Sequence, residues 1–374
     1  MNVLIATYLV PTSPSGVVTY CKTLADDLAG EGIGVRTIDA SHTPTLWRKG
    51  LGVLKRIMRP MGGAVSALYD EFAYFTGLYL AARRLRGLRF DLIHAQDVRS
   101  GVAVFLALRK RVPVVLTCHF NDDPVTELAE VFSLRPGAVR RLTDWYRFLF
   151  SYVRHYVFVS QYAYEKSKHL FPAGITRRIL RNTVRLTMPV ERQARVGSDP
   201  LLISNVGYID ERKNQKLLLQ IGRELRNRGV SNFSIWLIGD GPKRVEYEAL
   251  ADTFNLREQV RFLGRQAAPW QLVAQTDLYV HTSLNDNCPY SIVEAFAVQT
   301  PVLALPVGGI PEMLPDRHGP LRGTDVKGLA DQVLRYFDPA ARTELVKAQT
   351  QYADVNFNHR TALQQLIAFY RHVV

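Results

Sequence analysis

The sequence predicts an α/β protein made of two doubly wound domains in tandem. Short apolar runs alternate with amphipathic stretches along both halves of the chain, a pattern typical of parallel sheets covered by helices. A polar stretch at 186–200 interrupts this alternation, which then starts again. The length of 374 residues also fits two domains, each long enough to bury its own core.

Each expected element follows from a local pattern. In the first half, apolar runs predict strands at 3–6, 35–38, 92–94, 112–117 and 156–159. A turn at 11–16 precedes a helix, which is predicted by apolar residues at helical spacing: Val17, Tyr20, Leu24 and Leu28. In the second half we expect strands at 202–206, 235–238, 260–263, 278–281 and 302–305, and helices at 215–226 and 291–297. The last segment, 361–372, is amphipathic and predicts a further helix.

The net charge of +13 is concentrated in the first half, because residues 1–185 carry +12 and residues 186–374 only +1. Such an excess indicates an anionic partner, either a nucleic acid or an acidic membrane surface. At 46–61, apolar residues alternate with cations, which suits either an interfacial helix or a solvated surface helix.

Other sequence features indicate the cellular compartment. The cysteines, Cys21, Cys118 and Cys288, are too few and scattered for a disulfide framework or a structural zinc site, which favours a reducing cytosol. The opening residues lack the basic start of a secretory signal, and no apolar run is long enough to span a bilayer. We therefore expect a protein that is dissolved or lies on a membrane surface.

Ligands of open α/β sheets bind beyond the carboxyl ends of the strands, so the residues that follow strands are the candidate site. Gly16 follows the first strand without a full dinucleotide fingerprint, and either a tight turn or a phosphate explains it. Arg212 and Lys213 suit a pyrophosphate, although a solvated loop is the alternative. The Gly-Asp-Gly-Pro stretch at 239–242 favours a structural turn, with its Asp available as a helix cap.

The segment 281–312 is the most informative. A strand leads to Asp286, and a helix then begins near Tyr290 and Ser291, whose backbone N–H groups could bind an anion. Glu294 lies near the end of the first helical turn, where a carboxylate could accept two hydrogen bonds from a ribose diol. The alternative is a favourable first-turn acid without a ligand. The Gly-Gly turn at 308–309 adds backbone groups that no side chain shields.

Taken together, these motifs resemble glycosyltransferase family 4, retaining enzymes of the GT-B fold. The E-x7-E pattern of that family is matched by Asp286 and Glu294, and its Gly-to-Lys signature by Gly207 and Lys213. Further matches lie at 239–242, 260–264, 300–302 and 308–312, with looser ones at Gly16, 91–94, 117–119, Ser160 and Asn182. The resemblance implies two Rossmann-like domains facing a cleft: an acceptor-side domain at 1–190 and a nucleotide-sugar donor domain at 200–355. It also implies a terminal helix at 356–374 that packs back on the first domain.

The resemblance also implies roles for single residues. Glu294 would hold the donor's ribose hydroxyls, and Arg212 and Lys213 its diphosphate. Asp286 would lie near the transferred sugar, His119 near the reacting centre on the acceptor side, and Gly16 where the first loop approaches the phosphate. The remaining donor-binding positions follow one another along the chain: Asn287, Cys288, Pro289, Tyr290 and Ser291.

Two positions depart from the pattern of that family. Asp286 stands where the family usually has Glu, which shortens the reach of the carboxylate by one methylene. Tyr208 stands where the family usually has Arg, which leaves Arg212 as the substitute. Both departures bear on the identity of the donor sugar.

We therefore predict a retaining hexosyltransferase that moves a sugar from a nucleotide-diphosphate sugar, UDP-linked, to a lipid-linked or anionic acceptor in cell-surface polysaccharide or glycolipid biosynthesis. No cofactor or metal is expected, since backbone N–H groups, Arg212 and Lys213 can stabilise a leaving diphosphate. The neighbouring Asp122 and Asp123 do not form an Asp-x-Asp metal motif. We expect a cytoplasmic protein, peripheral on the inner face of the membrane through its basic first domain, and no nucleic-acid partner. The alternatives are a nucleotide-sugar epimerase on the same scaffold, a non-enzymatic polyanion-binding protein and an inactive sugar-binding relative.

Overall fold

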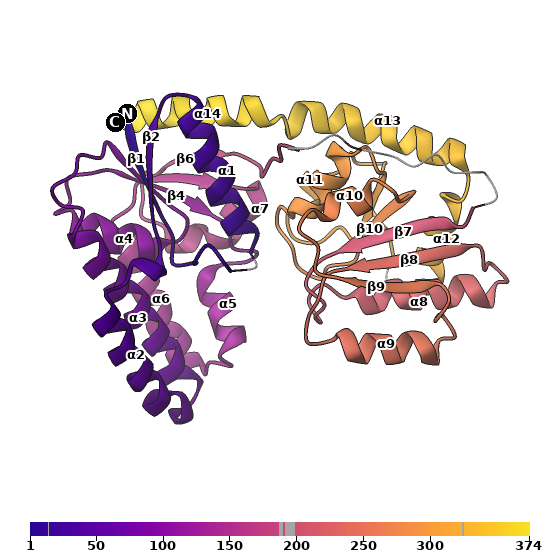
Figure 1. Ribbon diagram of the computed structural model, residues 1–374, viewed down its shortest axis with the longest axis horizontal. Coiled ribbons are helices and arrows are strands. Elements are labelled where there is room, and N and C mark those ends of the chain that lie inside the picture. The colour runs from indigo at the N-terminus through magenta and orange to yellow at the C-terminus, as the bar shows by residue number, and fades with distance from the viewer. Residues whose placement is uncertain (14, 187–189, 191–198, 324) are drawn as a thin grey trace. The chain divides into compact units, whose positions relative to one another are not determined.

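The computed structural model describes residues 1–13, 15–186, 190, 199–323 and 325–374. The chain divides into two compact units, each built around a parallel sheet covered by helices (Figure 1). Unit 1 comprises Met1–Arg181 and Arg360–Val374, and unit 2 comprises Asn182–His359. The predicted α/β class is confirmed. Most of the predicted linker, 187–189 and 191–198, lies outside the described residues, and the units divide at Arg181.

The sheet of unit 1 holds, in the described part of the chain, six parallel strands in the order β2-β1-β3-β4-β5-β6. They are β1 (Asn2–Ala6), β2 (Gly34–Ile38), β3 (Leu92–Ala95), β4 (Val114–Cys118), β5 (His155–Phe158) and β6 (Thr176–Ile179). Side chains of alternate residues enter two separate cores, as the pleat of a strand requires. Leu4 and Ala6 of β1 pack on the side of α3, α4 and α6, whereas Val3 and Ile5 pack with α1 and α14.

Three helices of unit 1 begin after a residue whose side chain caps them. Asp97, Asp123 and Ser160 each accept a hydrogen bond from a backbone N–H at the start of α4, α5 and α7. Asp123 therefore has a structural role. The helices are α1 (Gly16–Gly30), α2 (Thr45–Met58), α3 (Gly63–Arg83), α4 (Val98–Ala107), α5 (Pro124–Val131), α6 (Pro136–Phe150), α7 (Gln161–Ser167) and α14 (His359–Val373).

Helix α2, which covers most of the basic segment 46–61, lies on α3 without burying any of its own residues. Leu46, Val53 and Ile57 share one face of the helix and are 86%, 60% and 62% exposed. No helix of the described residues is long and apolar enough to cross a membrane.

The described part of unit 2 has five parallel strands in the order β11-β10-β7-β8-β9. Its strands are β7 (Leu201–Val206), β8 (Phe233–Ile238), β9 (Val260–Gly264), β10 (Leu278–His281) and β11 (Val302–Ala304). Its helices are α8 (Gln215–Asn227), α9 (Arg244–Thr253), α10 (Pro269–Val273), α11 (Tyr290–Ala297), α12 (Val326–Arg335) and α13 (Pro339–Asn356). Because β7 pairs with β10, the loops 207–214 and 282–289 leave the sheet side by side.

Two local details differ from the sequence-based expectations. Strand β6 was not predicted, because its residues include two arginines and none is fully buried. Asp240 does not cap the helix after the Gly-Asp-Gly-Pro turn. The residue before α9 is Lys243, and the Asp240 carboxylate instead accepts a hydrogen bond from the Gly241 N–H at 2.8 Å.

Candidate functional site

Two neighbouring loops at the carboxyl edge of the unit 2 sheet are joined by hydrogen bonds. The Leu284 N–H donates to the Arg212 carbonyl at 2.8 Å, and the Thr282 hydroxyl donates to the Lys213 carbonyl at 2.9 Å. The Arg212 guanidinium donates to the Asn285 carbonyl at 3.1 Å. The loop with the two predicted cations is thereby fixed against the loop with the predicted carboxylate.

Asp286 is the centre of a buried polar chain in this loop. Its carboxylate accepts a hydrogen bond from the Lys213 ammonium through a direct ion pair. The same oxygen lies 3.1 Å from His281 Nε2, and His281 Nδ1 lies 3.0 Å from the Tyr279 hydroxyl. Asp286 is 6% exposed and His281 1%. Hydrogen bonds to a buried carboxylate offset the cost of removing it from water.

The partners of Asp286 set its charge state. Burial alone would raise the pKa of this carboxyl, but Lys213 and His281 hold the pKa below its ordinary value. Burial lowers the pKa of His281, although Asp286 opposes that shift. Asp286 is therefore a fixed negative charge that is already paired.

Glycine is required at one turn of this site. The φ angle of Gly308 is +58°, and a Cβ at this position would lie 2.0 Å from the Asp286 carbonyl oxygen. The next residue, Gly309, donates its N–H to that same oxygen at 3.0 Å. The turn after β11 thus packs directly on the backbone that carries Asp286.

Helix α11 begins beyond that loop, and no side chain in the described part of the chain caps its start, which follows Pro289. The predicted residues 287–291 form this entry, and the Cys288 carbonyl accepts a hydrogen bond from the Asn182 amide at 2.7 Å. Glu294 lies on the first turns of α11 and is half-buried. Burial raises the pKa of its carboxyl to about 7.

Glu294 differs from Asp286 in having no hydrogen-bond or ion-pair partner among the described residues. Partial burial of a carboxyl without partners disfavours its charged form, and groups with such shifted pKa values are concentrated at functional sites. A ligand that donates hydrogen bonds would supply the missing partners.

The structure thus brings together, on one edge of unit 2, the predicted Arg212, Lys213, Asp286, residues 287–291 and Glu294. Sequence reasoning missed the part played by His281 and Tyr279. The signal available was a polar pair at the end of an otherwise apolar strand. No group of three or more His, Cys, Asp or Glu side chains placed to hold a metal ion occurs in the parts of the chain that the structure describes.

The other two predicted positions belong to unit 1. Gly16 is the first residue of α1, and Ser15 before it accepts a hydrogen bond from the Val17 N–H at 3.2 Å. His119 follows β4, and its Nε2 lies 2.8 Å from the Gln96 side-chain oxygen. Burial lowers the pKa of His119 to about 4, so its imidazole is neutral at physiological pH.

Comparison with known families decides the affiliation of the chain. The model of Glycosyltransferase Family 4 matches residues 14–184, and the model of Glycosyl transferases group 1 matches residues 190–347. Together they cover most of both units. The chain belongs to glycosyltransferase family 4.

Relatives of this family 4 chain include EpsF of Bacillus subtilis, named as a glycosyltransferase, which is 32% identical over 228 residues, or 57% of each chain. The lipopolysaccharide core biosynthesis glycosyltransferase LpsD of Rhizobium meliloti is 28% identical over 167 residues, or 44% of this chain and 47% of LpsD. The matches thus span about half the length of these curated relatives.

The structure of HepE of Anabaena in complex with UDP and glucose superposes on this chain with a TM-score of 0.70 at 17% identity. It covers 98% of both chains. This likeness confirms the GT-B fold with two Rossmann-like domains.

Proposed function

We propose that this family 4 chain is a retaining glycosyltransferase that uses a UDP-sugar donor without a metal ion. The observation that supports it most is Glu294, a half-buried carboxyl that lacks a partner among the described residues and lies just beyond the start of α11. A ribose offers two neighbouring hydroxyls that would each donate to this carboxylate. The structural relative HepE holds UDP and glucose, which supports uridine as the base.

The diphosphate would be bound by fixed positive charge. Lys213 has further N–H donors besides the one that binds Asp286, and Arg212 is anchored through Asn285 with part of its guanidinium exposed. The start of α11 adds the positive end of a helix dipole. These groups would stabilise the charge that develops on the leaving diphosphate, which is the role a metal ion has in other enzymes.

The transfer reaction exchanges one bond at the sugar C1 and moves one proton. The bond between the sugar C1 and the diphosphate oxygen breaks, and a bond from C1 to the acceptor oxygen forms. The acceptor's hydroxyl proton passes to the departing diphosphate. Asp286 is already bound by Lys213 and His281, which makes it a weak nucleophile. This pairing supports attack from the same face, without a covalent intermediate, as the route to retention.

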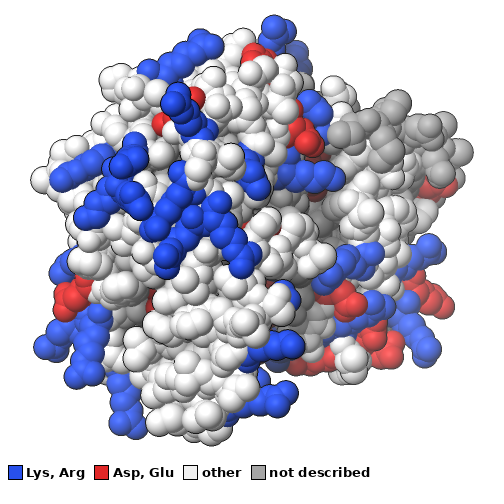
Figure 2. All heavy atoms as spheres, turned by 60° about the vertical axis from the view of Figure 1, so that its left-hand side comes forward, with Lys and Arg blue, Asp and Glu red and all other residues white. Residues whose placement is uncertain are grey.

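We further propose that the acceptor is lipid-linked, in cell-surface polysaccharide or glycolipid assembly, and that unit 1 contacts an acidic membrane surface on the cytoplasmic side. Lys and Arg gather on the face of unit 1 that Figure 2 brings forward. On α2, the exposed apolar face of Leu46, Val53 and Ile57 is bordered by lysines and arginines. This combination suits a helix that lies in a membrane interface.

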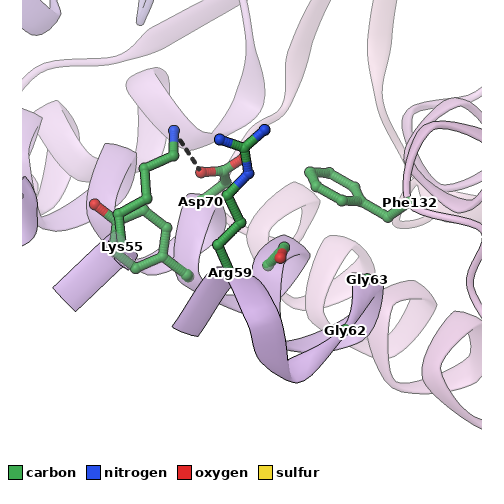
Figure 3. A pocket seen from close by; sticks show the side chains of 8 residues that line it. Lys55, Arg59, Gly62, Gly63, Asp70 and Phe132 are labelled. Atoms are coloured by element: carbon green, nitrogen blue, oxygen red, sulfur yellow. Dashed lines mark ion pairs between the residues drawn. The ribbon is translucent and has the colours of Figure 1, made fainter. Parts of the chain in front are cut away.

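Two of these cations come together where α2 meets α3. Lys55 and Arg59 line a cavity of about 460 Å³, and Lys55 lies 4.0 Å from Asp70 (Figure 3). Arg59 makes no ion pair in the described part of the chain, so its charge is available to an anionic headgroup. The arrangement supports an acidic lipid surface in preference to a neutral one.

Calorimetry with UDP, GDP and ADP in EDTA tests the donor site. We expect saturable binding of UDP, weakened roughly a hundredfold or more by Glu294→Ala, since two hydrogen bonds to a charged group, each worth about 1.5–3 kcal/mol, are lost. Glu258→Ala, at an exposed position of unit 2 outside the motifs of the candidate site, is the matched control. Equal affinity of the two variants for UDP would refute the ribose role, and binding that needs added Mg²⁺ would refute metal independence.

Sedimentation with vesicles tests the membrane contact separately. Wild-type protein should sediment with vesicles of acidic phospholipid at low salt and much less with neutral ones, and replacing Leu46, Val53 and Ile57 by serine should abolish the difference. UDP binding should stay unchanged in that variant. Equal sedimentation of the variant and the wild type would contradict the proposed role of α2.

A further inference from the structure

A cavity of about 350 Å³ lies within unit 2, along β11 at the edge of the sheet. Its walls come from β11, the segment 317–322 and α12. The segment is joined to β11 through its backbone, because the Ala304 N–H donates to the Gly319 carbonyl at 2.9 Å and the Leu321 N–H donates to the Ala304 carbonyl at 2.8 Å. None of the predicted donor-binding residues lines this cavity, so it is separate from the candidate donor site.

Arginine side chains gather at this cavity without a counter-charge. Arg317, Arg322 and Arg335 line it, and the described part of the lining contains no Asp or Glu. The three residues are exposed, and they form no ion pair with any described carboxylate. Residues 186–374 carry a net charge of only +1, so a general excess of cations does not explain the cluster. Like charges repel one another, and an anion placed between them removes that cost.

The carboxylates on neighbouring residues do not neutralise the cluster. Asp331 is paired with Arg228, and Glu344 Oε1 lies 3.8 Å from His318 Nε2. Asp316 precedes the segment but does not line the cavity. The positive charge at the cavity is therefore available to a ligand.

The backbone at the cavity is fixed in place before any ligand binds. The Arg322 N–H donates to the Gln332 side-chain oxygen at 2.8 Å, and the Gln332 amide donates to the Arg322 carbonyl at 2.6 Å. The Arg322 guanidinium donates to the Asp316 carbonyl at 2.8 Å. On α12, the Arg335 guanidinium lies 5.9 Å from the centre of the Tyr336 ring. Groups that are already ordered lose less conformational entropy when a ligand binds.

We propose that this cavity binds a small soluble phosphate monoester, with Arg317, Arg322 and Arg335 donating to its terminal phosphate oxygens. A monoester phosphate is a dianion at pH 8, and a guanidinium binds phosphate oxygens through paired N–H donors. The cavity has the volume of about twelve water molecules in the liquid, so a phosphate group fills only part of it. Leu303 and Leu321 supply apolar wall for the carbon part of the ligand. The site lies outside the proposed donor site and does not depend on it.

Calorimetry at pH 8 with inorganic phosphate and ribose 5-phosphate tests the cavity. UDP-glucose at saturation fills the proposed donor site and carries no terminal phosphate of its own. We expect saturable binding of both probes, tighter for ribose 5-phosphate. The double variant Arg317→Gln/Arg335→Gln should weaken it at least tenfold, since hydrogen bonds to a charged group are lost.

A second double variant, Arg257→Gln/Arg261→Gln, is the matched control, because it removes the same charge from other exposed positions of unit 2. It should bind both probes as the wild type does. Equal losses in the two double variants, or binding that does not saturate, would show a diffuse effect of surface charge and overturn the proposal. Equal affinity for dimethyl phosphate, a monoanion, would overturn the assignment to a monoester.

Thermal unfolding gives an independent readout. Arg317 and Arg335 are exposed, and no hydrogen bond joins their side chains to another described residue, so their replacement should leave unit 2 folded. A ligand that binds the folded state raises its unfolding midpoint. Ribose 5-phosphate should therefore raise the midpoint of unit 2 in the wild type but not in Arg317→Gln/Arg335→Gln. An equal rise in both proteins would overturn the assignment to this cavity.

Two comparisons separate this site from those proposed above. If ribose 5-phosphate binds only in the absence of UDP-glucose, it occupies the donor site and this inference fails. If ribose 5-phosphate binds through the arginines but UDP-glucose does not bind, the donor site fails and this site stands. Arg317→Gln/Arg335→Gln should sediment with acidic vesicles as the wild type does, and reduced sedimentation would overturn the assignment to a soluble ligand.

Discussion

At the scale of single residues, Glu294 lowers the stability of unit 2 at neutral pH. Its pKa of about 7 in the folded protein exceeds the value near 4.3 of an exposed Glu, so the folded state holds this proton more tightly than the unfolded chain does. Its contribution to stability is therefore lost as pH rises from about 4 through 7. Glu294→Gln should raise the unfolding free energy on the order of 2–3 kcal/mol at pH 8 and much less at pH 5. Thermal unfolding at both pH values measures this, and an equal gain at both would contradict the assigned pKa.

The affinity for the donor should increase with pH, whereas the contribution of Glu294 to stability decreases with pH. The ionised form of Glu294 accepts hydrogen bonds from both ribose hydroxyls, so affinity for UDP-glucose should fall as pH decreases from 8 to 6. The diphosphate of UDP-glucose does not itself change charge in this range, which makes it a better probe than UDP. Calorimetry across these pH values should show the loss in the wild type and a flat profile in Glu294→Gln.

The ion pair between Lys213 and Asp286 should behave as a unit. Lys213→Met leaves a buried carboxylate with His281 as its remaining partner, and removal of one member of a buried pair costs about 3–5 kcal/mol. Asp286→Asn together with Lys213→Met should cost less than the sum of the two single changes. A double-mutant cycle of unfolding free energies measures the difference, and strict additivity would show that the pair contributes nothing.

At the scale of elements, the turn after β11 supports the loop of Asp286. Gly308→Ala should place a methyl group against the Asp286 carbonyl, lower the thermal midpoint of unit 2 and reduce UDP affinity. Gly229→Ala is a matched control, because its φ is +80° but nothing lies within 4 Å of its Cβ position. The free energy of unfolding of this control should fall by about 1 kcal/mol, from backbone strain alone. Equal losses in the two variants would show that the contact with Asp286 is unimportant.

Sequence patterns located most elements but not their order in the sheets. Apolar runs predicted β7 and β10, whereas the pairing that sets their loops side by side depends on the whole domain. For this reason Lys213 and Asp286 were assigned to different parts of the donor, and their ion pair was not foreseen. Edge strand β6 was missed because an exposed strand lacks a continuous apolar run. The cluster of Arg317, Arg322 and Arg335 was missed because these side chains come together only through the fold.

At the scale of the whole molecule, the C-terminal helix α14 completes the core of unit 1, which is otherwise built from residues before 182. Its Leu366 and Ile367 pack with Val3 and Ile5, and the Tyr370 hydroxyl is hydrogen-bonded to His94 Nδ1 at 2.5 Å. Tyr370→Phe leaves that buried nitrogen without its partner, so we expect a loss of about 1–3 kcal/mol in the stability of unit 1.

Two readouts separate the effect of Tyr370→Phe on the two units. Thermal unfolding should show the transition of unit 1 shifted down, while UDP binding by unit 2 stays at the wild-type level. A matched change of similar chemistry on the surface, Tyr208→Phe, should alter neither stability nor fold, since that side chain is 51% exposed. A loss of UDP binding in Tyr370→Phe would contradict the assignment of α14 to unit 1.

The placement of α14 also has a consequence for synthesis. The ribosome must make all of 182–359 before it makes the helix that closes the core of unit 1. At about 5–20 residues per second, the first 181 residues wait roughly 10–40 s. During that time one face of their sheet is covered only in part, by α1. Unit 2, which is continuous in sequence, can fold during that interval. The nascent chain is therefore expected to acquire its second domain before its first is complete, and to expose the apolar side of β1 and β3 to chaperones in the meantime.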